Sequence, residues 1–353
     1  MLKRAMALFL LCAGMATWIS CGTTTSRFLY AAIPTGSAGQ ILVYREDPNS
    51  GVLTALSGSP YTAGPGVQAL AIHPSKKFLY GANSGSSDVS LFTLDATGAP
   101  TEVTPRTPVG TSPSLMVMDK AGAFLYVGSA GSNGSISAFS IDASSGALTA
   151  VAGSPFLIGV LPLNMKLSPS GSVLYVTGSP NIVEAFQVNA GVLGASVSMT
   201  TGSGPYGLAI DAAGAHLYTA NILDNSISEF TIQSDGSLLP ISGSPLGLTY
   251  LAPFALLVDN SGKYLYVADE GSSNLGAFAI GTDGSLTLLT NSPFGTGAQP
   301  SFVTTDSSGK YLFVANQSSA AIQSFSLDTS TGTLTSVASY STSNTPTSIV
   351  ISP

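Results

Sequence analysis

The sequence predicts an all-β fold, a seven-bladed β-propeller whose blades are four-stranded antiparallel sheets. A short phrase that ends in Leu-Tyr or Leu-Phe recurs every 43 to 50 residues, and periods of this length are typical of propellers and solenoids. Each interval contains four phrases with the composition of strands, which favours the propeller. The recurring phrase is marked by Tyr30, Tyr80, Tyr126, Tyr175, Tyr218, Tyr266 and Phe313.

The four strands of a unit, named a to d in chain order, are seen in representative phrases. Strand a is an apolar run that ends in a turn, as in YGLAIDAAG at 206–214, and strand b is rich in aromatic and β-branched residues, as in KYLYVAD at 263–269. Strand c alternates between polar and apolar residues, as in GSISAFSID at 134–142. Strand d is represented by GALTAVAGSPF at 146–156.

The order of these phrases predicts how the ring closes. The chain begins with a strand b at Arg27 and ends with a strand a at Pro353, so each of these strands lacks a partner in its own unit. We expect the two to pair and complete one blade, because pairing removes an exposed sheet edge. Residues 27–353 are therefore predicted to form one propeller domain.

The first 21 residues are predicted to direct export. MLKR is a positively charged start, and AMALFLLCAGMATWI is an apolar stretch too short for a comfortable membrane span. The following Ser-Cys pair resembles the lipobox of bacterial lipoproteins, in which the cysteine, here Cys21, is lipidated. The alternative is an ordinary cleaved signal peptide. Residues 22–26 would be a short tether, and the protein would lie in the cell envelope, facing the periplasm or the exterior.

Composition excludes several partner classes. Charged residues make up 8% of the chain and the net charge is -7, so no basic patch for nucleic acid or anionic lipid is expected. Contact with the membrane is expected through the lipid on Cys21 only. Because Cys12 lies in the apolar segment, a chain that starts at Cys21 has no disulfide. We expect a monomer without a cofactor.

Many of the units share an apolar run, a turn of the Asp-x-x-Gly or Ser-x-x-Gly type that is followed by Lys in two units, a phrase such as Tyr-Leu-Tyr-Val-Ala-Asp and a later Gly-Ser-Pro phrase. Over about residues 27–353 this pattern resembles the β-propeller lactonase family, which includes a 6-phosphogluconolactonase branch and relatives with YVTN-type repeats. The resemblance implies the propeller fold. It also implies lactone hydrolysis, with charged groups around one mouth of the channel.

The histidines occupy positions that repeat with the blade. His73 ends a strand a where other units have residues such as Asp119 and Asp211, and short polar side chains at this place start turns. His216 replaces a Phe or Tyr of strand b. Two histidines on different blades do not have the spacing of a metal site, so no metal centre is expected.

One face of the ring, called the top face, carries the b-to-c and d-to-a loops, and we expect the functional site there. The bottom face carries the a-to-b and c-to-d turns. Polar residues end strand b at Asn83, Asn221, Asp269 and Asn316. Asp269 and Glu270 form an adjacent acidic pair and are the candidate catalytic residues, whereas the three asparagines are candidate ligand-binding residues. The alternative is that all of them only form turns.

The d-to-a loops supply further candidate ligand-binding residues. These loops consist mainly of Pro, small and apolar residues, and they lack Arg, Lys, His, Asp and Glu. Without cations, phosphate recognition loses its strongest hydrogen bonds. The substantial side chains in these loops are Gln68, Asn164, Tyr206, Phe254 and Gln299.

These features favour a lactonase-like propeller that acts as a binding or interaction scaffold. Its ligand at the top face would be a protein, a glycan or a small molecule. The alternative is a lactone hydrolase of the 6-phosphogluconolactonase type, in which Asp269 or Glu270 activates water. A surface rich in Tyr, Phe, Asn and Gln would support the scaffold, and a perturbed carboxylate in a pocket at the channel mouth would support the hydrolase.

Overall fold

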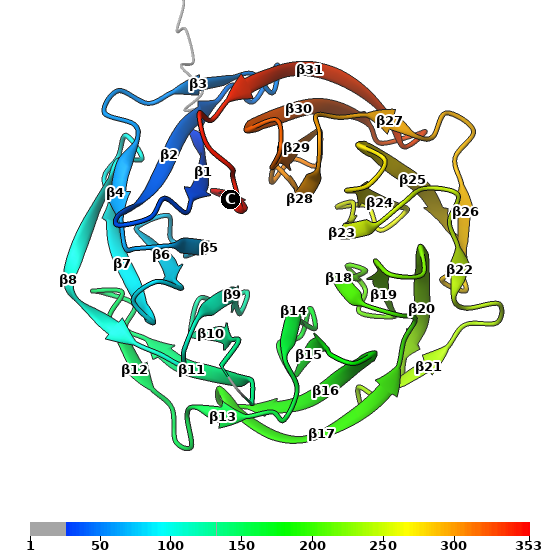
Figure 1. The fold of residues 1–353 in the computed structure, drawn as a ribbon, viewed down its shortest axis with the longest axis horizontal. Coiled ribbons are helices and arrows are strands. Elements are labelled where there is room, and N and C mark those ends of the chain that lie inside the picture. The colour runs from blue at the N-terminus through cyan, green and yellow to red at the C-terminus, as the bar shows by residue number, and fades with distance from the viewer. Residues whose placement is uncertain (1–25, 132) are drawn as a thin grey trace, which may run out of the picture.

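The computed structural model describes residues 26–131 and 133–353, and these residues form seven antiparallel sheets around a central channel (Figure 1). The described ranges contain no helix, and thus no helix that could span a membrane. The predicted fold class is confirmed. The expected signal segment 1–21, the lipidation site Cys21 and residues 22–25 of the tether lie outside the described residues.

Three strands of each blade follow the predicted phrases. The innermost strands, strand a, are β5 (Val67–Ile72), β9 (Pro113–Met118), β14 (Pro162–Leu167), β18 (Pro205–Ile210), β23 (Pro253–Val258), β28 (Pro300–Thr305) and β32 (Ser348–Ile351). Strand b corresponds to β1 (Arg27–Ile33), β6 (Phe78–Asn83), β10 (Phe124–Ser129), β15 (Val173–Gly178), β19 (His216–Asn221), β24 (Tyr264–Asp269) and β29 (Tyr311–Asn316). Strand c corresponds to β2 (Gly39–Glu46), β7 (Asp88–Leu94), β11 (Ser135–Ile141), β16 (Ile182–Asn189), β20 (Ser226–Ile232), β25 (Asn274–Ile280) and β30 (Ala321–Asp328).

The outermost strand differs between blades. It is continuous in β8 (Pro100–Pro108), β17 (Val192–Thr200) and β31 (Thr333–Ser341). Elsewhere it is split into β3 (Leu53–Ala55) and β4 (Tyr61–Ala63), β12 (Leu148–Ala150) and β13 (Phe156–Leu157), β21 (Leu238–Pro240) and β22 (Leu246–Gly247), and β26 (Leu286–Leu288) and β27 (Phe294–Gly295). A Ser-Pro pair lies at each split, preceded by Gly in three blades and by Asn291 in the fourth. There a serine hydroxyl accepts the hydrogen bond of a strand c N–H, as Ser292 does from Ala277 at 2.9 Å.

The ring closes as the sequence predicts. β32 pairs with β1, with Leu29 opposite Ile351, and so completes the blade that also contains β2 and β3. Figure 1 shows the blue and red ends of the chain side by side in this blade. At the start of β1, the Arg27 guanidinium lies 2.6 Å from the carboxylate of Asp306, which is in an a-to-b turn of the neighbouring blade. The chain therefore enters the propeller at the bottom face.

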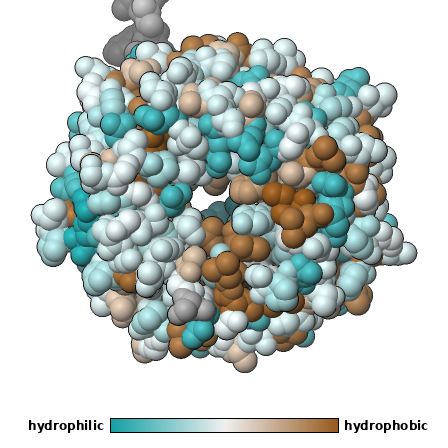
Figure 2. Space-filling view, viewed as in Figure 1, coloured by the Kyte–Doolittle hydropathy of each residue, from teal (hydrophilic) through white to brown (hydrophobic). Residues whose placement is uncertain are grey.

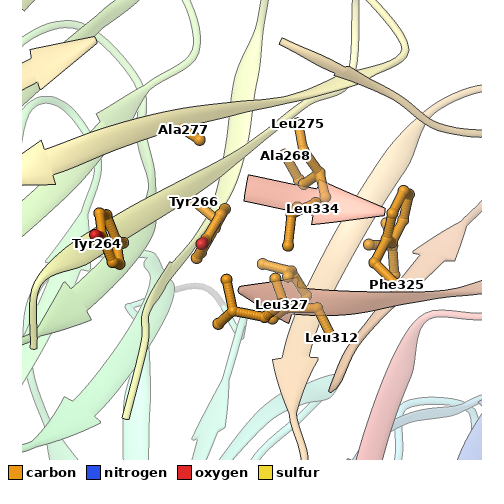
Figure 3. Close-up of a cluster of buried hydrophobic side chains, with 11 residues drawn as sticks. Tyr264, Tyr266, Ala268, Leu275, Ala277, Leu312, Phe325, Leu327 and Leu334 are labelled. Carbon is orange, nitrogen blue, oxygen red and sulfur yellow. The ribbon is translucent and has the colours of Figure 1, made fainter. Parts of the chain in front are cut away.

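The repeated tyrosine of strand b links neighbouring blades. Its ring is buried, and its hydroxyl donates to a glycine carbonyl in the c-to-d turn of the next blade, as Tyr218 does to Gly284 at 2.8 Å. The same type of bond is made by Tyr30, Tyr80, Tyr175 and Tyr266. Figure 3 shows one such layer, in which side chains of β24 and β25 pack against those of β29, β30 and β31. Repetition of this residue thus serves the packing of blade on blade.

Candidate functional site

The channel contains a cavity of about 370 Å³, walled by the innermost strands and open to the surface (Figure 2). Near the top of each wall strand, one equivalent position points to the cavity. That position holds a different kind of side chain in most blades: Gln68, Ser114, Leu163, Tyr206, Phe254, Ser301 and Thr347. The channel wall is therefore asymmetric although the backbone repeats.

An aromatic pair forms one side of this wall. The rings of Tyr206 on β18 and Phe254 on β23 stack with their centroids 5.0 Å apart and their planes 29° apart. Gly207 allows this approach, because a Cβ atom at that position would lie 2.9 Å from the carbonyl oxygen of Phe254. The missing side chain lets the two strands come close enough for their aromatic rings to meet.

The rest of the wall is mostly polar and uncharged. β5 lies across the ring from β18 and β23 (Figure 1), so Gln68 faces the aromatic pair from the opposite side. Asn164, Gln317 and Thr347 also line the cavity. Amide side chains both donate and accept hydrogen bonds, so this wall can bond the hydroxyl and carbonyl groups of a neutral polar ligand.

Lys166 is the one charged side chain among the described residues that line the cavity. It lies on β14, reaches the solvent of the channel and has no ion pair within the described chain. Because protein surrounds the channel on all sides, the ammonium group of Lys166 is partly desolvated. This desolvation lowers its pKa. Sequence reasoning missed Lys166 because it considered the loops and not the channel face of strand a.

Exposed leucines lie at the top face around the channel mouth. Leu161 and Leu251 precede β14 and β23, and Leu223 follows β19; their exposed fractions are 41%, 55% and 74%. Figure 2 shows hydrophobic surface beside the opening, over the region of β14 and β23. The mouth is therefore apolar on the side of the aromatic pair.

The structure brings together four of the residues predicted in the d-to-a loops, since Gln68, Asn164, Tyr206 and Phe254 all line the cavity. Gln299 does not line it and is exposed on its loop. Gln317, which was not predicted, contributes an amide to the wall instead.

The three asparagines that end strand b are fully buried inside their blades. A glycine of the d-to-a loop covers each of them; a Cβ atom on Gly202, for example, would lie 2.4 Å from the amide nitrogen of Asn221. The Asn221 amide donates to the hydroxyls of Ser226 and Ser228, both at 2.9 Å. Equivalent glycine cover is found at Asn83 and Asn316. The Asn83 amide likewise donates to Asp88 and Ser90, whereas the Asn316 amide has no hydrogen-bond partner in the described chain. None of the three side chains lines the cavity.

Asp269 occupies the same buried position as Asn221 but has different surroundings. Tyr250 replaces the covering glycine, and Gly276 replaces the bonding serine. The carboxyl group accepts one hydrogen bond, from the Gly276 N–H at 3.2 Å, and its Oδ1 atom has no partner in the described chain. Burial raises the pKa of Asp269 to about 8, so the group is mostly neutral at pH 7.

Glu270 is partly buried, and this burial also raises the pKa of its carboxyl group. Neither Glu270 nor Asp269 lines the cavity. A catalytic role for either of them stays a prediction.

Both histidines lie at the bottom of the ring. His73 Nε2 is 3.0 Å from the carbonyl oxygen of Gly122 in the next blade, and His216 Nδ1 is 2.8 Å from the carboxylate of Asp211. Within residues 26–131 and 133–353, no cluster of three or more His, Cys, Asp or Glu side chains could hold a metal ion.

The ring of four-stranded blades around a lined channel defines the protein as a β-propeller. The family model described as Lactonase, 7-bladed beta-propeller matches residues 5–113 and 182–351. This is well over half of the chain, which therefore belongs to the seven-bladed β-propeller lactonase family. The match omits residues 114–181, and this segment contains Asn164 and Lys166.

Several solved structures share the fold. A putative 6-phosphogluconolactonase from Bacteroides fragilis NCTC 9343 has a TM-score of 0.80 at 21% identity, covering 94% of this chain and 99% of that chain. The periplasmic gluconolactonase of Pseudomonas aeruginosa has a TM-score of 0.77 at 20% identity, covering 93% and 99%. A Lactobacillus plantarum protein has a TM-score of 0.78 at 21% identity, covering 92% and 99%. No curated protein matches the chain.

Proposed function

We propose that the protein is a ligand-binding member of the lactonase family that holds a small, ring-shaped, polyhydroxylated molecule in the channel cavity. The observation that carries this proposal is the stacked pair of Tyr206 and Phe254, which faces amide and hydroxyl side chains across the cavity. A volume of about 370 Å³ lies in the range of small-molecule sites. Such sites combine an apolar wall with a few convergent polar groups.

The chemistry of the wall matches a sugar or sugar lactone. An aromatic surface packs against the C–H groups on one face of such a ring, and this contact removes apolar area from water. The amides of Gln68, Asn164 and Gln317 can then bond the hydroxyl groups at the ring edge. Binding of this kind requires no catalytic group and is compatible with a neutral ligand.

Calorimetric titration of the full-length protein with cellobiose and glucono-δ-lactone tests the proposal. We expect binding by the wild type and an affinity at least tenfold lower in Phe254→Ala and in Gln68→Ala, since a truncated contact of this kind costs about 1.4 kcal/mol or more. Phe294→Ala, the same change on the outer strand β27, is the matched control and should leave the affinity unchanged. If neither probe binds, or if Phe254→Ala binds as the wild type does, the proposal is wrong.

Lactone hydrolysis is the second candidate function, and family membership favours it. The groups available to activate water are Asp269 and Glu270. Asp269 is buried and mostly neutral at pH 7, so it would have to become accessible and ionised before it could act as a base. We therefore expect the full-length protein to leave the spontaneous hydrolysis rate of 6-phosphogluconolactone unchanged. Turnover that disappears in Asp269→Asn or Glu270→Gln would establish the hydrolase instead.

We propose in addition that the protein is exported and anchored through a lipid on Cys21, with its bottom face toward the membrane. The ion pair between Arg27 and Asp306 supports this orientation, because it holds the start of β1 at the bottom face. Cys21 precedes Arg27 by only six residues, and an extended segment of that length reaches about 20 Å.

Labelling of intact membranes tests the orientation. Probes attached at Ser87 and Ser273 in the b-to-c loops should be accessible, and probes at Ser170 and Ser307 in the a-to-b turns should be shielded. Mass spectrometry should find a lipid on Cys21. Equal labelling of both sets, or an unlipidated Cys21, would contradict the proposed anchor.

A further inference from the structure

We infer that Lys166 binds the negative charge of the ligand, so that the cavity takes an elongated monoanion of the sugar-acid class. This inference rests on the proposed ligand-binding function of the channel and names the class of ligand. The Lys166 charge lies on the wall of the channel, on β14, whereas the d-to-a loops carry no charged side chain.

The fold does not require a cation at this position. Lys166 is the fifth residue of its strand a, and the equivalent residues in the other blades carry no charge: Ala71, Val117, Ala209, Leu257, Thr304 and Val350. These six strands form the same ladders and pack into the same ring without a charged side chain. Lys166 is therefore not needed for packing. Its charge either has a role outside folding or lowers the stability of the fold.

No group within the described chain neutralises Lys166. The strands on either side, β9 and β18, present uncharged residues such as Met116 and Leu208 to the cavity, and Tyr206 is the one other titratable group among its lining residues. An unpaired cation that protein partly removes from water is unfavourable. Desolvation lowers the pKa of this ammonium group, and a bound anion would oppose that shift.

The geometry sets the length of the ligand. Leu163 is equivalent to Tyr206 in the ring, and Lys166 lies three residues further down β14. This separation is at most about 10 Å along the strand, because the register of β14 shifts at Leu163. A ligand that contacts both the aromatic pair and the ammonium group is therefore about two sugar rings long. Asn164 lies on β14 between the level of the aromatic pair and Lys166, and its amide can form hydrogen bonds with the hydroxyl groups of the ligand. A disaccharide-sized aldonate or uronate meets these requirements.

Lys166 lies in the segment 114–181 that the lactonase family model does not match. The proposed anion site therefore lies in a part of the wall that the family match does not cover. β14 carries both Asn164 and Lys166, so one strand supplies both the charge and the nearest amide.

A pair of probes that differ in one carboxylate tests the inference. Cellobionate and cellobiose have similar length, but only cellobionate carries a negative charge. We expect the full-length wild type to bind cellobionate at least tenfold more tightly than cellobiose. Lys166→Met should bind both probes equally, and Lys120→Met, which removes an exposed lysine from a bottom-face turn, should behave as the wild type. Unchanged melting temperatures would show that the variants are folded.

Chemical labelling provides a second readout that does not need a variant. The acetylation rate of Lys166, measured by mass spectrometry and compared with that of Lys263, should fall when acetate, gluconate or cellobionate is bound, because the anion keeps the ammonium group protonated. Cellobionate affinity should also fall as the pH rises through the pKa of Lys166, whereas cellobiose affinity should not change in that range.

The outcomes separate this inference from the proposed function. If cellobiose binds in a Phe254-dependent way and cellobionate binds no better, ring binding stands and the role of Lys166 is wrong. If anions protect Lys166 but Phe254→Ala has no effect on cellobionate, the anion site stands and the aromatic pair is not part of the ligand site. If none of the three anions protects Lys166, the inference is overturned.

Discussion

Two positions that occur once in each blade differ sharply in how they vary around the ring. The buried tyrosine of strand b is Tyr in six blades and Phe313 in the seventh. The channel-facing position at the top of strand a, in contrast, is Gln, Ser, Leu, Tyr, Phe, Ser and Thr in ring order, beginning at Gln68 and ending at Thr347, which directly precedes β32. The first position packs between blades, whereas the second faces the channel.

The contrast follows from what each position contacts. Each of these tyrosines packs against the neighbouring blade, as Tyr218 and Tyr266 do. Because this contact is similar between all pairs of blades, the same residue type fits in each. The channel positions converge on one cavity, and an asymmetric ligand there contacts each of them differently. Phe313 replaces the tyrosine in the blade that packs against the closing blade. These two blades are also joined by the Arg27–Asp306 ion pair. Loss of the repeat therefore marks either the closure of the ring or its binding site.

The largest expected effect is on closure. Deletion of residues 346–353 removes β32 and exposes the edge of β1, where Leu29 and Ala31 are fully buried in the intact ring. We expect aggregation or loss of the cooperative unfolding transition, measured by circular dichroism during heating. A tag added after Pro353 is the control and should leave the transition unchanged. A truncated protein that melts like the full chain would contradict closure by β32.

The next largest effect concerns Asp269, the one acid at the buried end of strand b. Because its folded pKa of about 8 exceeds the ordinary carboxyl value, its contribution to stability falls as the pH rises from about 4 to about 8. Asp269→Asn removes this penalty, and the new amide can donate to Asn274 Oδ1, which lacks a partner in the described chain. We expect the variant to be more stable at pH 7, by at most about 4 kcal/mol, since one pKa unit corresponds to about 1.4 kcal/mol.

The pH dependence separates this effect from a simple packing change. The gain of Asp269→Asn, measured by urea unfolding, should shrink to near zero by about pH 4, where the unfolded carboxyl also becomes protonated. The reverse change, Asn221→Asp, should destabilise at pH 7, since it loses two hydrogen bonds to serine hydroxyls. A gain that is independent of pH, or a loss of stability at pH 7, would show that Asp269 is ionised in the fold.

The smallest of these effects tests the repeated tyrosine itself. Tyr218→Phe leaves the Gly284 carbonyl without its 2.8 Å hydrogen bond and should lower the free energy of unfolding by about 1 kcal/mol. Tyr126 forms no such glycine bond in the described chain, so Tyr126→Phe should have a smaller effect. Equal losses in the two variants would mean that the hydroxyl does not link the blades.

The sequence was sufficient to predict the fold because the repeat encodes it. The number of blades, their strand order and the pairing of the chain ends all follow from the spacing of phrases such as KYLYVAD and from where the first and last phrases fall. Four of the channel residues were also predicted, since Gln68, Asn164, Tyr206 and Phe254 follow the d-to-a loops in sequence. The split of the outer strand was not predicted, because it depends on a serine side chain that replaces a backbone partner.

The rest of the site depends on contacts that a single strand does not reveal. Asn83, Asn221 and Asn316 end their strands at the top face, but the covering loop glycines bury them. Lys166 has the position of a neutral strand residue, and only the assembled ring shows that this position faces a channel. Alignment of the seven strands does show that Lys166 is the one charge at its position, and this signal could have found it.

The most direct test of the central claim is a crystal structure of the full-length protein grown with cellobionate. We expect density for the ligand inside the channel, with one ring against Phe254 and the carboxylate within about 3 Å of the Lys166 ammonium nitrogen. The repeated tyrosines and buried asparagines should have no contact with it. Ligand density in the loops away from the channel or on the bottom face, with only water between Phe254 and Lys166, would contradict the claim that the asymmetric wall is the binding site.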